Sequence, residues 1–222
     1  FREFVDATDI FIQGENLTLG SFEVGSGYGS GGDIIFQAND SIIAGNIEAT
    51  IRDEGGGGDI GGQIELVANN GNISVADLNS SVLFPSGSLA LSAGGDISLR
   101  AGGSISAGQI NSSSFNESGG QISLTAATGQ ISIGDIDSSG LTGGSISLIA
   151  RTQVTAGEII SNADPNTGGD GGDVFIDPLG DVEVSFINAQ GGLNGEGGTV
   201  DITAGRFFRA TEAFIDQNDV VA

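Results

Sequence analysis

One eight-residue phrase recurs along this 222-residue chain and constrains its fold more than any other feature. The phrase opens with Gly-Gly, continues with a polar residue and an alternating apolar run, and usually ends in Ala. It stands at residues 31–38, 61–68, 94–101, 119–126, 143–150, 171–178 and 197–204, with successive starts 30, 33, 25, 24, 28 and 26 residues apart. A period in this range is typical of an array that stacks one supersecondary unit many times.

A second apolar pattern follows each Gly-Gly phrase. Two apolar residues stand two positions apart, and a third follows three positions later. The sets are Ile42, Ala44, Ile47; Ile73, Val75, Leu78; Ile105, Ala107, Ile110; Ile131, Ile133, Ile136; Val154, Ala156, Ile159; and Val182, Val184, Ile187. Alternation with period two predicts a strand, and the three-residue step predicts a bend between two short strands.

The units are predicted to stack as a parallel β-helix. A Gly inside a helix costs about 1 kcal/mol, so Gly pairs in every unit disfavour helices. The same apolar positions recur at whole-unit spacing, so equivalent residues should form inward columns. The first column is Ile34, Ile64, Ile97, Ile122, Ile146, Val174 and Val200, and the second is Phe36, Leu66, Leu99, Leu124, Leu148, Ile176 and Ile202.

We therefore expect an all-β, right-handed parallel β-helix (a solenoid) of about eight coils of 24–33 residues each. The right hand is the default for parallel crossovers. Residues 1–222 are expected to form one β-helix repeat segment of a longer or processed chain, with no internal boundary. Residues 87–103 carry an extra apolar run, which predicts an added strand or a wider side in that coil.

The net charge of the chain limits the classes of partner that it can bind. There are 29 Asp and Glu against six Arg and no Lys, which gives a net charge of −23. Nucleic acid and anionic membranes would be repelled by this surface, so we expect neither as a partner. No apolar stretch is long enough to span a bilayer, so we expect no membrane insertion. The absence of Cys and His removes disulfides, thiolate metal sites and the commonest general base.

The texture of the coils resembles filamentous-haemagglutinin-type adhesins of the two-partner secretion pathway. Residues 119–136, GGQISLTAATGQISIGDI, carry the likeness, and residues 204–216, AGRFFRATEAFID, are similar to a phrase in the later repeats of the long cyanobacterial members. The resemblance implies a large exported protein at the cell surface, built as a right-handed β-helix. It supplies no catalytic residues to carry over.

One polar column follows the third apolar position of each unit. It contains Glu48, Asn79, Asn111, Asp137, Ile160 and Asn188. Asn side chains tolerate left-handed backbone at corners and form local hydrogen bonds. We interpret Asn79, Asn111, Asp137 and Asn188 as a structural corner ladder, hydrogen-bonded up and down the rod and interrupted at Ile160.

A possible calcium motif stands at residues 168–176, GGDGGDVFI, which fits the nonapeptide pattern of calcium-binding β-rolls. Asp170 and Asp173 are its candidate ligands. The motif occurs once, whereas such sites need tandem copies, and Asp173 also fills the ordinary polar slot of the repeat. A glycine-rich corner without calcium is the favoured interpretation, and no cofactor is expected.

Two function classes remain. The favoured one is a structural or adhesive surface protein, a rigid stalk or filament segment that contacts copies of itself end to end or side by side, and cell-surface polysaccharide. The alternative is a β-helical carbohydrate-active enzyme or carbohydrate-binding module, for which Asp77, Asp135 and Glu158 share one outward slot. The chain has one Tyr and no Trp for stacking on sugars. We therefore expect that this chain is not an enzyme.

Overall fold

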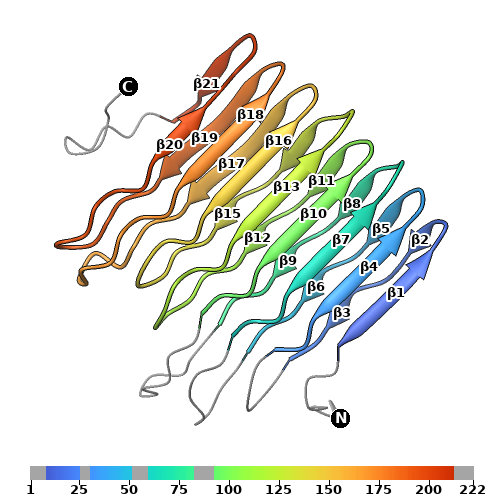
Figure 1. The fold of residues 1–222 in the computed structure, drawn as a ribbon, viewed down its shortest axis with the longest axis horizontal. Coiled ribbons are helices and arrows are strands. Elements are labelled where there is room, and N and C mark those ends of the chain that lie inside the picture. Colours follow the sequence, from blue (N-terminus) through green and yellow to red (C-terminus); the bar gives the residue numbers. More distant parts are fainter. Residues whose placement is uncertain (1–8, 26–30, 52–59, 83–92, 213–222) are drawn as a thin grey trace.

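The computed structural model describes residues 9–25, 31–51, 60–82 and 93–212 (Figure 1). Every regular element in these residues is a strand, and every strand pair is parallel. The chain winds as a β-solenoid in which each coil adds a strand to an eight-stranded sheet and further strands to a 13-stranded sheet. The predicted parallel β-helix is confirmed.

The eight-stranded sheet is built from the Gly-Gly phrases. In spatial order, it contains β1 (Ile10–Gly14), β4 (Ile34–Ala38), β7 (Ile64–Ala68), β10 (Ile97–Ala101), β13 (Ile122–Ala126), β16 (Ile146–Ala150), β18 (Val174–Pro178) and β20 (Val200–Ile202). The register pairs Ile34 with Ile64 and Leu99 with Leu124, as the predicted columns require. From β1 to β20 the chain makes seven full turns, with one strand for each of eight coils.

The 13-stranded sheet contains the predicted bend. One ladder joins β2 (Leu17–Thr18), β5 (Ile42–Ala44), β8 (Ile73–Val75), β11 (Ile105–Ala107) and β14 (Ile131–Ile133). A second ladder joins β3 (Phe22–Glu23), β6 (Ile47–Glu48), β9 (Leu78–Asn79), β12 (Ile110–Asn111) and β15 (Ile136–Asp137). In each of these coils a short corner separates the two strands, at the expected three-residue step.

The two ladders merge in the later coils. The seven-residue strand β17 (Val154–Ile160) pairs with both β14 and β15, and β19 (Val182–Asn188) continues from it to β21 (Phe208–Ala210). The sequence pattern predicts separate short strands here too. The difference is local, because the apolar step is unchanged and the backbone keeps its pairing across the bend.

Stacked aliphatic side chains fill the interior of the coil. Five-residue strands such as β4, β7 and β13 have buried first, third and fifth residues, while the second and fourth face outward. Ile34, Ile64, Leu99 and Ile122 are among the fully or almost fully buried side chains. Each such side chain stabilises the fold by about 1.5–3 kcal/mol, so repeating the column in every coil holds neighbouring coils together.

A row of buried serines explains the second glycine of four of the Gly-Gly pairs, at Gly95, Gly120, Gly144 and Gly172. Ser80, Ser112, Ser138 and Ser161 are fully buried, and each hydroxyl donates a hydrogen bond to the carbonyl oxygen of a Gly-Gly phrase. The acceptors are Gly62, Gly95, Gly120 and Gly144, respectively. A Cβ at position 120 would overlap the hydroxyl of Ser112 and the backbone of Gly95. Only glycine fits there.

Two expectations stay predictions. The extra strand falls partly on residues 87–92, which lie outside the described residues, and residues 93–103 contain the ordinary strand β10 alone. The right-handed sense of the coil follows from the general preference of parallel crossovers.

Candidate functional site

Polar residues at the entry to the strands tie each coil to the next. In the slot before the eight-stranded sheet, the backbone N–H of Asp33 donates to Oδ1 of Asp9 at 3.0 Å, and that of Gln63 donates to Oδ1 of Asp33 at 2.8 Å. The N–H of Gln121 donates to Oδ1 of Asp96 at 2.8 Å. These side chains satisfy backbone donors that no strand pairs, so the slot holds coils together.

A second row of polar residues joins adjacent coils by hydrogen bonds at the entry to the 13-stranded sheet. Each backbone N–H in this row donates to the side-chain oxygen of the equivalent residue one coil earlier: Ser41 to Asn16, Asn72 to Ser41, Ser104 to Asn72, and Gln130 to Ser104, at 2.7–3.2 Å. Sequence analysis did not identify these inter-coil bonds. The signal was an uncharged polar residue at this slot in each of these coils.

The calcium candidates take part in this kind of contact. Oδ1 of Asp173 accepts the backbone N–H of Thr199 at 2.7 Å, and Oδ1 of Asp170 accepts that of Glu196 at 2.8 Å. Both carboxylates therefore brace the following coil. Among the described residues, no group of three or more acidic side chains is arranged to hold a metal ion.

The candidate carboxylates of the enzyme alternative lie in a third row of the same kind. Oδ1 of Asp77 accepts the backbone N–H of Gln109 at 2.9 Å, and Oδ1 of Asp135 accepts that of Glu158 at 3.0 Å. The amide of Gln109 also lies 3.4 Å from Oδ2 of Asp135. Asp77, Asp135 and Glu158 therefore lie in one row, as expected. Two of the three carboxylates, those of Asp77 and Asp135, accept a backbone N–H group of the next coil.

The corner ladder has the predicted stacking but differs in its hydrogen bonds. Asn111 pairs in register with Asn79 and Asp137. Oδ1 of Asn111 accepts the N–H and the hydroxyl of Ser113 in its own coil, at 2.9 and 2.7 Å. Asn79 and Asp137 make the same turn with the second residue after each, and Oδ1 of Asn188 accepts the N–H of Gln190.

These bonds run within one coil, whereas we expected side chains bonded up and down the rod. The physical reason is reach, because an Asx side chain lies close to the backbone two residues on and shapes the corner locally. Ile160 occupies the same position without such an oxygen, at the coil where the two ladders have merged into β17.

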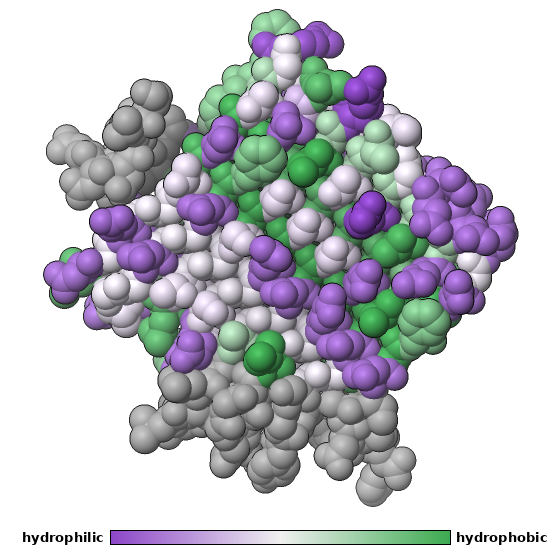
Figure 2. Space-filling model, viewed as in Figure 1, coloured by the Kyte–Doolittle hydropathy of each residue, from purple (hydrophilic) through white to green (hydrophobic). Residues whose placement is uncertain are grey.

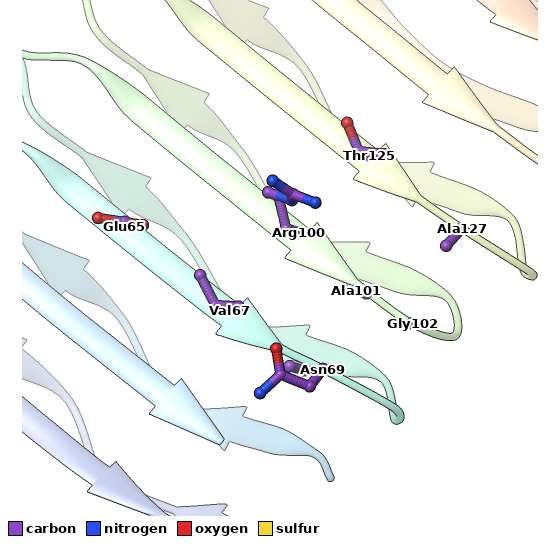
Figure 3. Close-up of a pocket in the computed structure, with 9 residues that line it drawn as sticks. Glu65, Val67, Asn69, Arg100, Ala101, Gly102, Thr125 and Ala127 are labelled. Carbon is purple, nitrogen blue, oxygen red and sulfur yellow. The ribbon is translucent and has the colours of Figure 1, made fainter. Parts of the chain in front are cut away.

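A shallow depression of about 300 Å³ lies on the outer face of the eight-stranded sheet (Figure 3). It crosses β7, β10 and β13 near their C-terminal ends, and its lining includes Glu65, Val67, Asn69, Arg100 and Thr125. Figure 3 shows Arg100 in the middle, with the three β7-side residues on one side and Thr125 on the other. This depression was not anticipated from the sequence.

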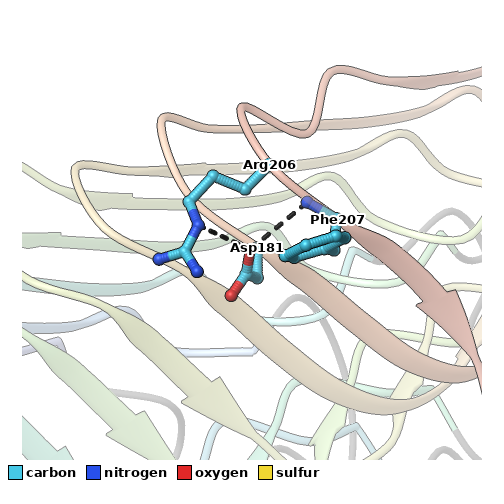
Figure 4. Close-up of polar contacts among 3 residues, drawn as sticks. All are labelled: Asp181, Arg206 and Phe207. Atoms are coloured by element: carbon cyan, nitrogen blue, oxygen red, sulfur yellow. Dashed lines mark hydrogen bonds and ion pairs between the residues drawn. The ribbon is translucent and has the colours of Figure 1, made fainter.

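The last described coil differs from the others. Nε of Arg206 lies 3.6 Å from Oδ1 of Asp181, and the same oxygen accepts the backbone N–H of Phe207 (Figure 4). Arg209 lies 3.4 Å from its register partner Glu183. The side chains of Val200, Phe207 and Phe208 in this coil are exposed.

Comparison with known proteins gives no relative: no family model, no curated protein and no solved structure matches this chain. The part of the chain that the structure describes contains no helix that could cross a membrane.

Proposed function

We propose that this chain is a rigid stalk or filament segment of an extracellular, filamentous-haemagglutinin-like surface adhesin, and that it is not catalytic. One observation carries the proposal. The same inward columns and the same outward rows of polar side chains recur from coil to coil, so the described coils are close structural equivalents of one another.

A rod made of equivalent coils suits a mechanical role. Each coil adds about 4.8 Å of length and contacts only its neighbours, so length can change without redesign of the fold. Adjacent coils are joined by strand pairing, apolar columns and the polar rows at the strand entries. All these contacts would resist bending.

Charge and side-chain roles support a stalk over an enzyme. Of the five acids that sequence analysis considered as catalytic or calcium-binding candidates, four accept backbone N–H groups: Asp77, Asp135, Asp170 and Asp173. An acidic surface of net charge −23 also keeps parallel rods apart in solution and favours cationic or neutral partners.

Labelling of intact cells that produce the protein tests this proposal. Antibody against residues 93–212 should label unpermeabilised cells, and external protease should remove the label. An antibody against a cytosolic protein of the same cells serves as control and should bind after permeabilisation. Label that appears only in permeabilised cells would rule out the surface role.

A further inference from the structure

Arg100 and Glu65 lie in one depression without a partner in the part of the chain that the structure describes. Arg100 is the fourth residue of β10 and faces outward between Val67 on β7 and Thr125 on β13. Glu65 lies opposite Ser98, two positions away from Arg100 along the strand. Diagonal neighbours of this kind lie about 7–8 Å apart, and the ion pairs of the described residues join Arg206 to Asp181 and Arg209 to Glu183, not Arg100 to Glu65.

The surroundings of Arg100 differ from those of Arg209 in the last described coil. There, Arg209 lies directly opposite Glu183 in the register, and the two side chains form an ion pair. Arg100 has the neutral residues Val67 and Thr125 in those positions. Its donors and the acceptors of Glu65 therefore remain available to a ligand.

The charges of the depression select the class of ligand. One guanidinium and one carboxylate sum to zero, in a chain of net charge −23 that repels polyanions. A polycation would meet Arg100 at the centre of the depression. A neutral molecule with many hydroxyl groups can instead accept from Arg100, donate to Glu65 and exchange hydrogen bonds with Thr125 and Asn69.

Beside the depression, a row of hydroxyl groups runs along the rod on the same outer face. Ser98 pairs in register with Ser123, and Ser123 with Ser147, which places one outward hydroxyl on each of three successive coils. Figure 2 shows this face of the molecule, where residues of intermediate hydropathy (white) extend from the left side to the centre and are mixed with hydrophobic and hydrophilic residues towards the right. Successive hydroxyls lie about 4.8 Å apart, so they face an extended ligand with regularly spaced polar groups.

We propose that the outer face of the eight-stranded sheet binds a neutral polysaccharide chain, anchored in the depression between Glu65 and Arg100 and lying along the serine row. This proposal rests on the proposed function, because it supplies the ligand class of an adhesive rod. Val67 offers an apolar surface to a sugar ring, while the charged pair and Thr125 hold its hydroxyls.

Affinity electrophoresis tests the proposal with the whole chain. The protein is run through gels that contain dextran, galactomannan, hydroxyethylcellulose or, as a polyanion, polygalacturonate. Retardation is expected in at least one neutral gel. Arg100→Ala and Glu65→Gln should each raise the dissociation constant about tenfold or more, the loss expected when one partner of a charge-assisted hydrogen bond is removed.

Matched controls separate this site from general surface effects. Arg151→Ala removes another exposed arginine, and Asp201→Asn removes another exposed acid of the same sheet. Both should bind as the parent does, and all variants should show the parent's circular dichroism and melting temperature. Arg100→Lys keeps the charge without the planar fork and should bind with intermediate affinity.

Three outcomes would overturn the proposal: no retardation in any neutral gel, equal retardation of the Arg100 variant and the parent, or stronger retardation in polygalacturonate than in every neutral glycan. Each would leave the stalk standing if intact cells are still labelled. Conversely, binding in gels with no label on intact cells would keep the glycan site and remove the surface role.

Discussion

Ser112 donates a hydrogen bond from its buried hydroxyl to the carbonyl oxygen of Gly95, across the interior of the same coil. That hydroxyl occupies the space that a Cβ at position 120 would need in the next coil. The row of buried serines and the repeated Gly-Gly pair therefore depend on each other. The serine hydroxyl joins two sides of its own coil, and the glycine leaves room for the next coil to stack on that hydroxyl.

Gly120→Ala should destabilise the fold by about 3 kcal/mol or more, since the added methyl group meets the Ser112 hydroxyl and the Gly95 backbone and neither can move away easily. Gly168→Ala is the control, because no atom lies within 4 Å of a Cβ there. Urea unfolding measures both. Equal free energies of unfolding for the two variants would contradict the serine–glycine packing.

Ile131→Asp should cost several kcal/mol because it places an unpaired carboxylate in a fully buried column. Ser132→Asp, one residue on, faces outward and should be nearly neutral. Thermal melting compares the pair. Similar losses at both positions would mean that the strand register is wrong.

Calcium should raise the melting temperature modestly, and magnesium or sodium at matched ionic strength should do much the same, because each screens the charge of −23. Asp173→Asn should change little, since an amide oxygen can still accept the N–H of Thr199. A saturable, calcium-specific shift at micromolar concentration, lost in Asp170→Asn or Asp173→Asn, would instead establish a calcium site.

The isolated 222-residue chain should associate end to end through its last described coil. Apolar side chains are exposed there, among them Val200 and Phe208, and the outer edges of β20 and β21 have no described strand beside them. Phe208→Ser should reduce association in sedimentation velocity. Phe115→Ser, which alters an exposed phenylalanine elsewhere, should not. A parent chain that stays monomeric at high concentration would refute this expectation.

The sequence predicts the interior far better than the surface contacts. Inward positions such as Ile64 and Leu124 follow from alternation and whole-unit spacing, because packing of the core fixes both. Alternation says which side a residue faces but not which neighbour its side chain reaches. The inter-coil bonds of Asp33 and the local turn of Asn111 therefore needed coordinates.

The buried serines left a signal that pattern analysis missed. Ser80, Ser112 and Ser138 each follow a residue of the polar column, in the phrases Asn-Ser-Ser and Asp-Ser-Ser. A serine in this place looks like a loop residue, since burial of a hydroxyl is unfavourable until its acceptor is known. The depression around Arg100 is also beyond pattern analysis, because it depends on residues of three coils side by side.

Removal of one coil tests the central claim, that equivalent coils build a rod of adjustable length. Deletion of residues 122–145 joins Gln121 to Ile146 and removes β13, β14 and β15 with the register intact. Small-angle X-ray scattering should show a folded rod about 4.8 Å shorter. Deletion of residues 122–133 breaks the register and should unfold the chain. If the whole-coil deletion also unfolded, or left the length unchanged, the coils would not be interchangeable modules.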